Sequence, residues 1–154
     1  MKILITGCAG FIGFHLAKKL LEDKKNFIYG VDNLNNYYDL DLKKNRLKIL
    51  KKNNFFIFKK LDICNKIKLK NYFKSNKFNC VIHLAAQAGV RYSIDNPSTY
   101  FSNNIEGFFH ILEMSRIYNI RHLVFASTSS VYGNSNNFPL QEGDNTDKPL
   151  SFYA

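Results

Sequence analysis

Three glycines and an aspartate near the start of the chain have the types and spacing that bind a dinucleotide. Gly7, Gly10 and Gly13 follow the apolar run Lys2–Thr6, and Asp32 ends the next apolar run. A glycine turn between a strand and a helix lets backbone N–H groups approach a pyrophosphate. A carboxylate roughly 20 residues further on can accept ribose hydroxyls and would repel a 2′-phosphate. The pattern predicts an NAD site rather than an NADP site, with a plain strand–helix turn as the alternative.

A second group of reactive side chains lies late in the sequence. The polar cluster 127–130, which contains Ser127, Thr128 and Ser129, follows an apolar run, and Tyr153 lies 25 residues beyond Thr128. Taken alone, the cluster is compatible with an ordinary polar strand end. A phenol with an ordinary pKa of about 10 does not act as a base at neutral pH without help.

Several other side chains have both a chemical and a structural interpretation. Cys8 lies inside the glycine turn and is expected to be a small filler rather than a reactive thiol. His83 ends an apolar run and is expected to pack in the core. Arg91 is a lone cation that either contacts a substrate or lies on the surface. Tyr37 and Tyr38 can shield an adenine or pack on the second helix.

The elements that must position these residues alternate between strand and helix. Apolar runs predict strands over 2–6, 26–31, 55–61, 80–85 and 122–127, and apolar periodicity predicts helices over 11–22, 40–52, 65–75 and 97–119. A polar loop follows over 132–150. Alternation of apolar strands with helices predicts an α/β fold, a doubly wound parallel sheet (Rossmann-like) with helices on both faces. We expect it to be truncated after about five strands, with the substrate lobe absent.

Composition narrows the classes of protein that this chain can represent. The 154 residues are 45% hydrophobic, which suits one globular domain. The net charge of +10 comes from dispersed lysines, which does not favour nucleic-acid binding but can attract an anionic substrate. The chain has three cysteines and no CxxC pair, which argues against a metal site or a disulfide framework. No run suits a signal peptide or membrane span, so we expect no membrane partner and a cytoplasmic location.

The motifs together resemble one enzyme family across all 154 residues. The chain is similar to the N-terminal part of the extended short-chain dehydrogenases/reductases, in particular the nucleotide-sugar epimerases and dehydratases. The segments that carry this resemblance are 6–13, 62–63, 83–87, 103–104, 127–133 and 153–154. Segments 31–39 and 88–93 resemble UDP-glucuronate 4-epimerases, including those of capsule and lipopolysaccharide synthesis.

The resemblance implies an NAD-binding domain over 1–154, incomplete because the C-terminal substrate domain would be missing. It implies contacts to the pyrophosphate, the adenosine ribose, the adenine and the remaining cofactor from Gly7, Gly10, Phe11, Ile12, Gly13, Asp32, Asn33, Asp62, Ile63, Leu84, Ala85, Ala86, Gln87, Asn103 and Ser127. Two alternatives remain open: Asp62 can cap a helix, and Asn103 can lie on a solvated helix face.

For catalysis, the resemblance implies 4-epimerisation of a UDP-sugar, from UDP-glucuronate to UDP-galacturonate, through a transient 4-keto sugar. Tyr153 would be the general base, Thr128 would hydrogen-bond the sugar 4-OH, and Arg91 and Ser129 would bind substrate. The related 4,6-dehydratases have an acidic pair after the threonine, whereas this chain has serines, which disfavours elimination.

Three further expectations follow from the same resemblance. UDP-glucose or another nucleotide sugar is the alternative substrate. The chain ends before the lysine that follows the family's tyrosine by four residues, so a non-catalytic nucleotide-binding fragment is a second alternative. The resemblance also implies a homodimer for full-length proteins.

Overall fold

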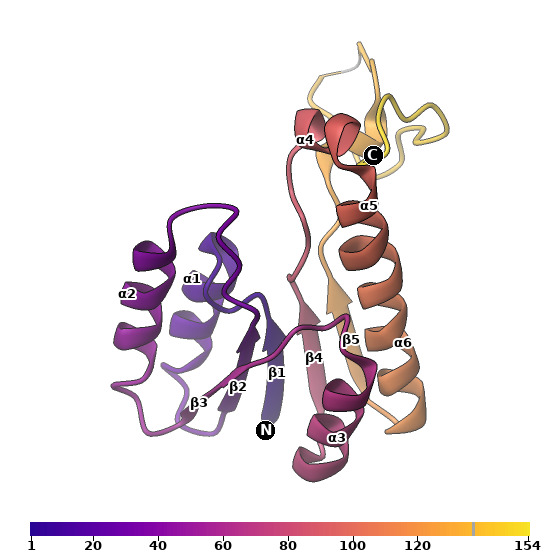
Figure 1. The fold of residues 1–154 in the computed structure, drawn as a ribbon. Coiled ribbons are helices and arrows are strands. Elements are labelled where there is room, and N and C mark those ends of the chain that lie inside the picture. The colour runs from indigo at the N-terminus through magenta and orange to yellow at the C-terminus, as the bar shows by residue number, and fades with distance from the viewer. Residues whose placement is uncertain (137) are drawn as a thin grey trace.

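The computed structural model describes residues 1–136 and 138–154 (Figure 1). Helices and strands alternate along the chain through β5, apart from the helical segments between β4 and β5. In order, the elements are β1 (Lys2–Thr6), α1 (Phe11–Leu20), β2 (Phe27–Asp32), α2 (Leu40–Leu50), β3 (Phe56–Lys60), α3 (Lys66–Asn76), β4 (Cys80–His83), α4 (Val90–Asp95), α5 (Pro97–Tyr100), the π-helix η1 (Phe101–Gly107), α6 (Phe108–Ile117), β5 (His122–Phe125) and the 3₁₀-helix η2 (Ser129–Tyr132).

All strand pairs are parallel, and the strands lie in the order β3-β2-β1-β4-β5. Leu4 of β1 is in register with Tyr29 on one side and with Val81 on the other. The sheet therefore grows in opposite directions from β1. The crevice beyond the carboxyl ends of β1 and β4 is where such sheets bind ligands, and the predicted Rossmann-like fold is confirmed.

Each face of the sheet has its own core because strand side chains alternate between faces. Ile3 and Ile5 of β1 pack with α1 and α2, whereas Leu4 packs with α3 and α6. Figure 1 shows the two pairs of helices on either side of the strands. Because all five strands are parallel, their carboxyl ends lie at the same edge of the sheet, where the candidate ligand-binding residues gather.

The expected elements exist, but some of their boundaries were wrong. β4 ends at His83 and β5 at Phe125, so 84–85 and 126–127 are loop rather than strand. The expected helix 97–119 is three consecutive segments, α5, η1 and α6, and α4 was not predicted. In α1 the small Gly13 and Ala17 pack inward in place of Ile12.

Several large apolar residues of the predicted helices are also exposed: Leu42, Ile49, Ile67 and Leu112. In α2, Lys43 is buried, whereas the adjacent Leu42 is exposed. Apolar periodicity identifies an apolar stripe on a helix, but it does not show which residues of that stripe a neighbouring element will bury. Within residues 1–136 and 138–154, no helix has the length and apolar character needed to cross a membrane.

Candidate nucleotide and sugar site

The glycine turn between β1 and α1 brings three chain segments together. Gly7 adopts φ 71° and donates its N–H to Val31 O at 2.8 Å. It lies so close to the segment after β4 that an added Cβ would be 2.9 Å from Ala85 N. A Cβ on Gly13 would overlap the Gly7 carbonyl oxygen. Gly13 therefore allows the start of α1 to pack closely on the turn. A side chain at Gly7 or Gly13 would force the backbone of the turn into a different conformation.

The N-terminus of α1 is open to an anion. Gly10 is the N-cap residue with extended backbone, and within the described residues no side chain caps the helix and no acidic residue occupies its first turn. The N–H groups of a first helical turn need partners from outside the helix and carry the positive end of the helix dipole. A pyrophosphate would meet both needs.

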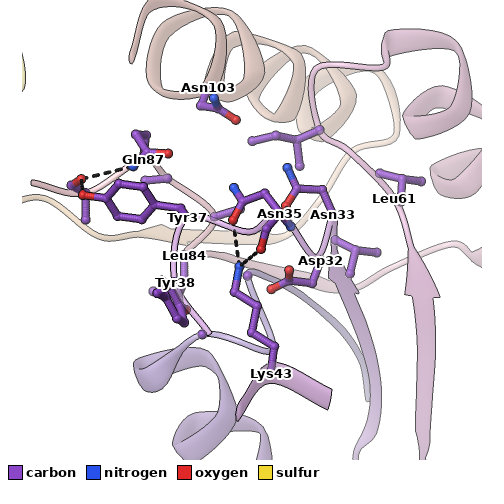
Figure 2. A pocket seen from close by; sticks show the side chains of 17 residues that line it. Asp32, Asn33, Asn35, Tyr37, Tyr38, Lys43, Leu61, Leu84, Gln87 and Asn103 are labelled. Atoms are coloured by element: carbon purple, nitrogen blue, oxygen red, sulfur yellow. Dashed lines mark hydrogen bonds between the residues drawn. The ribbon is translucent and has the colours of Figure 1, made fainter. Parts of the chain in front are cut away.

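Asp32 connects this turn to the end of β2. Its Oδ2 accepts the N–H of Ala9 at 3.1 Å, and its Oδ1 accepts the N–H of Leu34 at 2.9 Å. The side chain is 8% exposed and lines a pocket together with Gly7, Gly10 and Asn33 (Figure 2). Because each carboxylate oxygen has a further lone pair, ribose hydroxyls can still be accepted.

Asp62 lies outside this pocket and holds one of the residues that line it, Asn33. It accepts Asn33 Nδ2 at 3.1 Å and Cys64 N at 2.9 Å. Burial alone would raise the pKa of this carboxyl, but these hydrogen bonds outweigh burial and lower its pKa. Asp62 is not the cap of α3, because Asn65 accepts the N–H of Lys68 at that helix end.

The segment after β4 is held by Thr6. The Thr6 hydroxyl accepts the N–H groups of Leu84 and Ala85, each at 3.1 Å, and lies 2.8 Å from Nδ1 of His83. Burial lowers the pKa of His83 to about 4, so the ring is neutral at pH 7 and Nδ1 can accept the Thr6 proton. His83 is a core histidine, as expected, and stacks on Phe108.

Asn104, on η1, fixes the next part of the same segment. Its Oδ1 accepts Gln87 N at 2.8 Å and its Nδ2 donates to Gln87 O at 2.9 Å. Sequence reasoning assigned a role only to the neighbouring Asn103, which lines the pocket and donates to Thr99 O at 2.8 Å. The adjacent polar pair within an apolar helix was the available signal for both.

The two tyrosines whose roles were open lie differently. Tyr37 donates to Ala88 O at 3.0 Å across the pocket, and Tyr38 places its ring 4.4 Å from Lys43 Nζ of α2. Both tyrosines line the same pocket as Asp32. Cys8 is fully buried, and burial raises the pKa of its thiol, consistent with a filler.

A second pocket contains the late hydroxyl cluster and the tyrosine. It is lined by Ser127, Thr128, Tyr153, Ile12 and Phe108, among others. Thr128 Oγ1 accepts Ser130 N at 3.2 Å and thereby caps η2. Tyr153 is held through its backbone N–H, which donates to Ser93 Oγ at 3.3 Å.

The two pockets share one wall. Leu84, Ala85, Ala86 and Ala88 line both of them. Three of these four residues are alanines, so the wall carries mostly small side chains. Residues far apart in sequence, from Gly7 to Tyr153, thus form two adjoining sites.

The structure does not bring every expected residue to a pocket. Of the candidates, Gly7, Gly10, Asp32, Asn33, Ile63, Leu84, Ala85, Ala86, Gln87 and Asn103 line the first pocket, and Ile12, Ser127, Thr128 and Tyr153 line the second. Five candidates line neither: Phe11, Gly13, Asp62, Arg91 and Ser129. Asn35, Leu61 and Lys43 were not predicted, and they line the first pocket. Asn35 and Leu61 had a signal, because both come shortly after the carboxyl end of a strand, whereas Lys43 lies inside α2 and had none.

The sheet order, the glycine turn and the carboxylate at the end of β2 define a Rossmann-like α/β protein. The family model described as GDP-mannose 4,6 dehydratase matches residues 4–154, and the chain belongs to this family. Protein CapI of Staphylococcus aureus is 52% identical over 160 residues, which cover 100% of this chain and 46% of that protein. The UDP-glucuronate 4-epimerase of Thermodesulfobacterium geofontis is 46% identical and is matched over 98% of this chain and 46% of its own length.

A solved structure shows the same arrangement. The UDP-glucuronic acid 4-epimerase of Bacillus cereus, in complex with UDP-glucuronic acid and NAD, superposes with a TM-score of 0.90 at 35% identity. The alignment covers 99% of this chain and 48% of that one. The chain therefore spans about half the length of the relatives it matches.

Proposed function

We propose that the protein is an NAD-dependent nucleotide-sugar 4-epimerase that interconverts UDP-glucuronate and UDP-galacturonate. The observation that carries this proposal is the shared wall between the pocket of Asp32 and the pocket of Tyr153. A cofactor that extends across this wall would reach a sugar held beside Tyr153. The names of the relatives and the ligands of the Bacillus cereus enzyme support the same reaction and substrate.

The residues of the first pocket fit NAD. The bare turn at Gly7 and Gly10 suits a pyrophosphate, and Asp32 and Asn33 suit the adenosine ribose. Leu61 and Ile63 supply apolar surface for the adenine. Bound NAD would supply the hydride acceptor and donor of the reaction.

In the second pocket, Tyr153 would remove the proton of the sugar 4-OH and Thr128 would hydrogen-bond the same oxygen. A 4-keto sugar would then form transiently. It would rotate in the pocket and be reduced on its other face. An ordinary tyrosine pKa is about 10, so Tyr153 needs a nearby cation to act at neutral pH. Ser129 and Ser130 are not acids, which supports epimerisation over elimination.

Further features of the whole protein belong to the same proposal. Residues 1–154 form its NAD-binding domain, and a homodimer is the assembly implied by the family. A cytoplasmic location is supported by three free cysteines at positions 8, 64 and 80, which suit a reducing compartment.

The decisive experiment incubates the whole protein with UDP-glucuronate and follows the sugar by NMR. We expect UDP-galacturonate to form, and Tyr153→Phe to abolish its formation. If UDP-glucose reacts and UDP-glucuronate does not, the substrate assignment is wrong. A thermal melt of the 154-residue chain with and without NAD tests the nucleotide site separately, because a bound ligand raises the melting temperature.

A further inference from the structure

One hydrogen bond joins two walls of the first pocket that leave the sheet at different strands. Segment 33–38 follows β2 and segment 84–88 follows β4, and β1 lies between these two strands. Both segments line the pocket that contains Asp32. Among residues 1–136 and 138–154, a single hydrogen bond connects them. In this bond, the latch, Tyr37 donates its hydroxyl to Ala88 O at 3.0 Å (Figure 2).

The wall that accepts the latch is held from the protein interior. Ala88 O also accepts the hydroxyl of Tyr100 at 2.8 Å, and Tyr100 is buried. The buried Gln87 donates its Nε2 to the same oxygen at 3.3 Å, and Asn104 bonds the backbone of Gln87 on both sides. A carbonyl oxygen has two lone pairs, and here three donors share it. Because Tyr37 is the exposed donor of the three, the wall does not depend on it.

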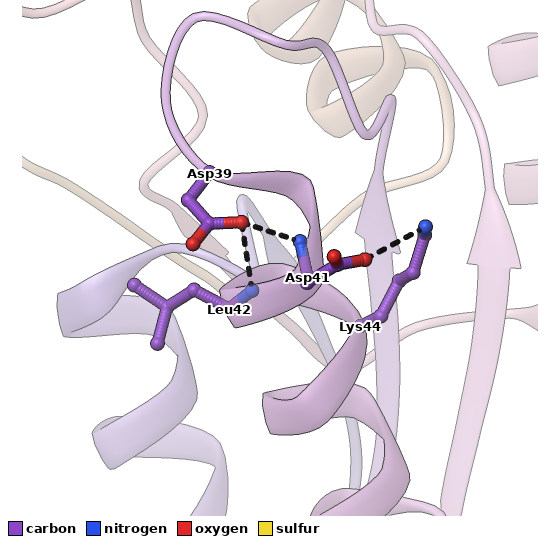
Figure 3. Close-up of polar contacts among 4 residues, drawn as sticks. All are labelled: Asp39, Asp41, Leu42 and Lys44. Atoms are coloured by element: carbon purple, nitrogen blue, oxygen red, sulfur yellow. Dashed lines mark hydrogen bonds and ion pairs between the residues drawn. The ribbon is translucent and has the colours of Figure 1, made fainter.

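The loop that donates the latch is anchored on both sides of Tyr37. On one side, Lys43 Nζ donates to Asn35 O at 2.9 Å. On the other side, Asp39 caps α2 by accepting Asp41 N at 2.7 Å (Figure 3). Tyr37 itself is 43% exposed. A single hydrogen bond between neutral groups at the surface is a weak restraint, so the latch can open while both ends of the loop stay bound.

Gly89 leaves the space that the latch needs. A Cβ on this glycine, which has φ 106°, would lie 2.7 Å from the Tyr37 hydroxyl oxygen. That distance is shorter than any normal contact, and the atom that would have to move is the outer end of a side chain. An alanine at this position would therefore displace the Tyr37 hydroxyl. The Tyr37 ring packs beside that of Tyr92, with centroids 5.1 Å apart, which keeps it on this side of the loop.

We propose that the latch sets the rate at which NAD enters and leaves the pocket, and not the strength with which NAD is bound. This inference rests on the proposed function. In that reaction the hydride returns to the sugar, so one NAD serves every turnover and its release is not a required step.

The position of the latch explains why it would act on rates. The latch joins protein to protein, so it is closed in both the empty and the loaded pocket and opens only while NAD passes between the two walls. A bond that is present in both end states and broken between them slows entry and exit by the same factor. The equilibrium between the empty and the loaded protein stays unchanged.

The test measures both rates on the whole protein with radiolabelled NAD. Uptake is followed in protein freed of cofactor, and release is followed during a chase with excess unlabelled NAD. Tyr37→Phe should accelerate both by the same factor, about two- to ten-fold, the ratio expected for one neutral hydrogen bond, and leave the Kd unchanged. Tyr118→Phe is the matched control, because it loses a similar bond to Lys70 O away from the pocket, and both of its rates should equal those of the unmodified protein.

Gly89→Ala tests the latch from its other side. It should accelerate uptake and release as Tyr37→Phe does, because it displaces the same hydroxyl. In the double variant it should add nothing, since two changes that act through one contact are not additive. A further acceleration there would contradict the proposal. If a thermal melt shows that Gly89→Ala is unfolded, the rates of Tyr37→Phe decide alone.

The remaining outcomes separate the latch from the site that it closes. If Tyr37→Phe changes only one of the two rates, or neither, the proposal is wrong, and faster release with unchanged uptake would indicate a direct contact between Tyr37 and NAD. If the unmodified protein takes up no NAD, the proposed NAD site is refuted and the latch with it. Uptake by the unmodified protein with unchanged rates in Tyr37→Phe refutes the latch alone.

Discussion

The ring of Tyr100 meets the ring of Tyr153 edge-on, with their centroids 5.8 Å apart and their planes inclined by 69°. Tyr100 is 1% exposed, and its hydroxyl donates to Ala88 O at 2.8 Å. Ala88 belongs to the wall shared by the two pockets. One buried side chain thus contacts both the proposed base and the wall that the two pockets share.

Tyr100 should consequently affect both stability and turnover. Tyr100→Phe keeps the ring contact and removes the hydroxyl that the carbonyls of Ala88 and Gly89 share, for a cost of about 1 kcal/mol. Tyr100→Ala should cost about 3 kcal/mol or more and lower kcat strongly, because the Tyr153 ring loses its neighbour. Denaturant unfolding and initial rates measure these effects. Tyr118→Phe is the control, since it loses a similar bond to Lys70 O far from the site. Equal rates for Tyr100→Ala and the unmodified protein would contradict this prediction.

Ser93 should act on Tyr153 through the backbone. Its hydroxyl accepts Tyr153 N at 3.3 Å and donates to Val90 O at 2.6 Å, and it is buried. Ser93→Ala should reduce kcat several-fold with little change in NAD affinity, because the cofactor pocket does not include Ser93. Ser98→Ala, on the exposed surface of α5, serves as the comparison. Loss of NAD affinity in parallel with kcat would show that Ser93 has a general structural role instead.

A glycine substitution in the turn between β1 and α1 should be far more harmful than one at an open surface position. Gly7→Ala should destabilise the protein by about 2 kcal/mol or more, since it combines a left-handed backbone with a clash at Ala85. NAD-induced stabilisation should disappear in the same variant. Gly143→Ala is the matched substitution, because a Cβ there meets no atom within 4 Å. Thermal melts with and without NAD distinguish them, and a normal melt for Gly7→Ala would refute the role of the turn.

His83 predicts a pH dependence of stability. Burial lowers its pKa in the folded protein to about 4, below the ordinary histidine pKa of 6.5, so the unfolded chain binds more protons between these values. Stability should be constant above about pH 7 and fall as the pH decreases toward 4. His83→Gln retains an acceptor for the Thr6 hydroxyl but does not titrate, and it should flatten this dependence. Urea unfolding between pH 5 and about 7.5 tests it, above the range in which carboxylates titrate. An unchanged slope in His83→Gln would assign the effect to other groups.

Local pattern was sufficient for the fold and for part of the site. Alternating apolar runs specified β1 at its observed bounds, and the glycine spacing placed the turn before α1, because both depend on neighbours along the chain. The position of Asp32 at a strand end followed in the same way. Helix faces did not follow from the pattern: in α1 the small Gly13 and Ala17 are buried, whereas the larger Ile12 is exposed.

Contacts between distant segments decided the rest. The amino-acid sequence alone determined a parallel α/β protein with a glycine turn, a carboxylate at β2 and a late threonine–tyrosine pair. Only the tertiary structure showed that the wall 84–88 joins the two pockets, that Asn104 clamps Gln87, and that Lys43 is buried beside Asp32 rather than solvated. The physical reason is that burial and hydrogen bonding of a side chain depend on which surfaces meet in space, and residue spacing along one element does not contain that information.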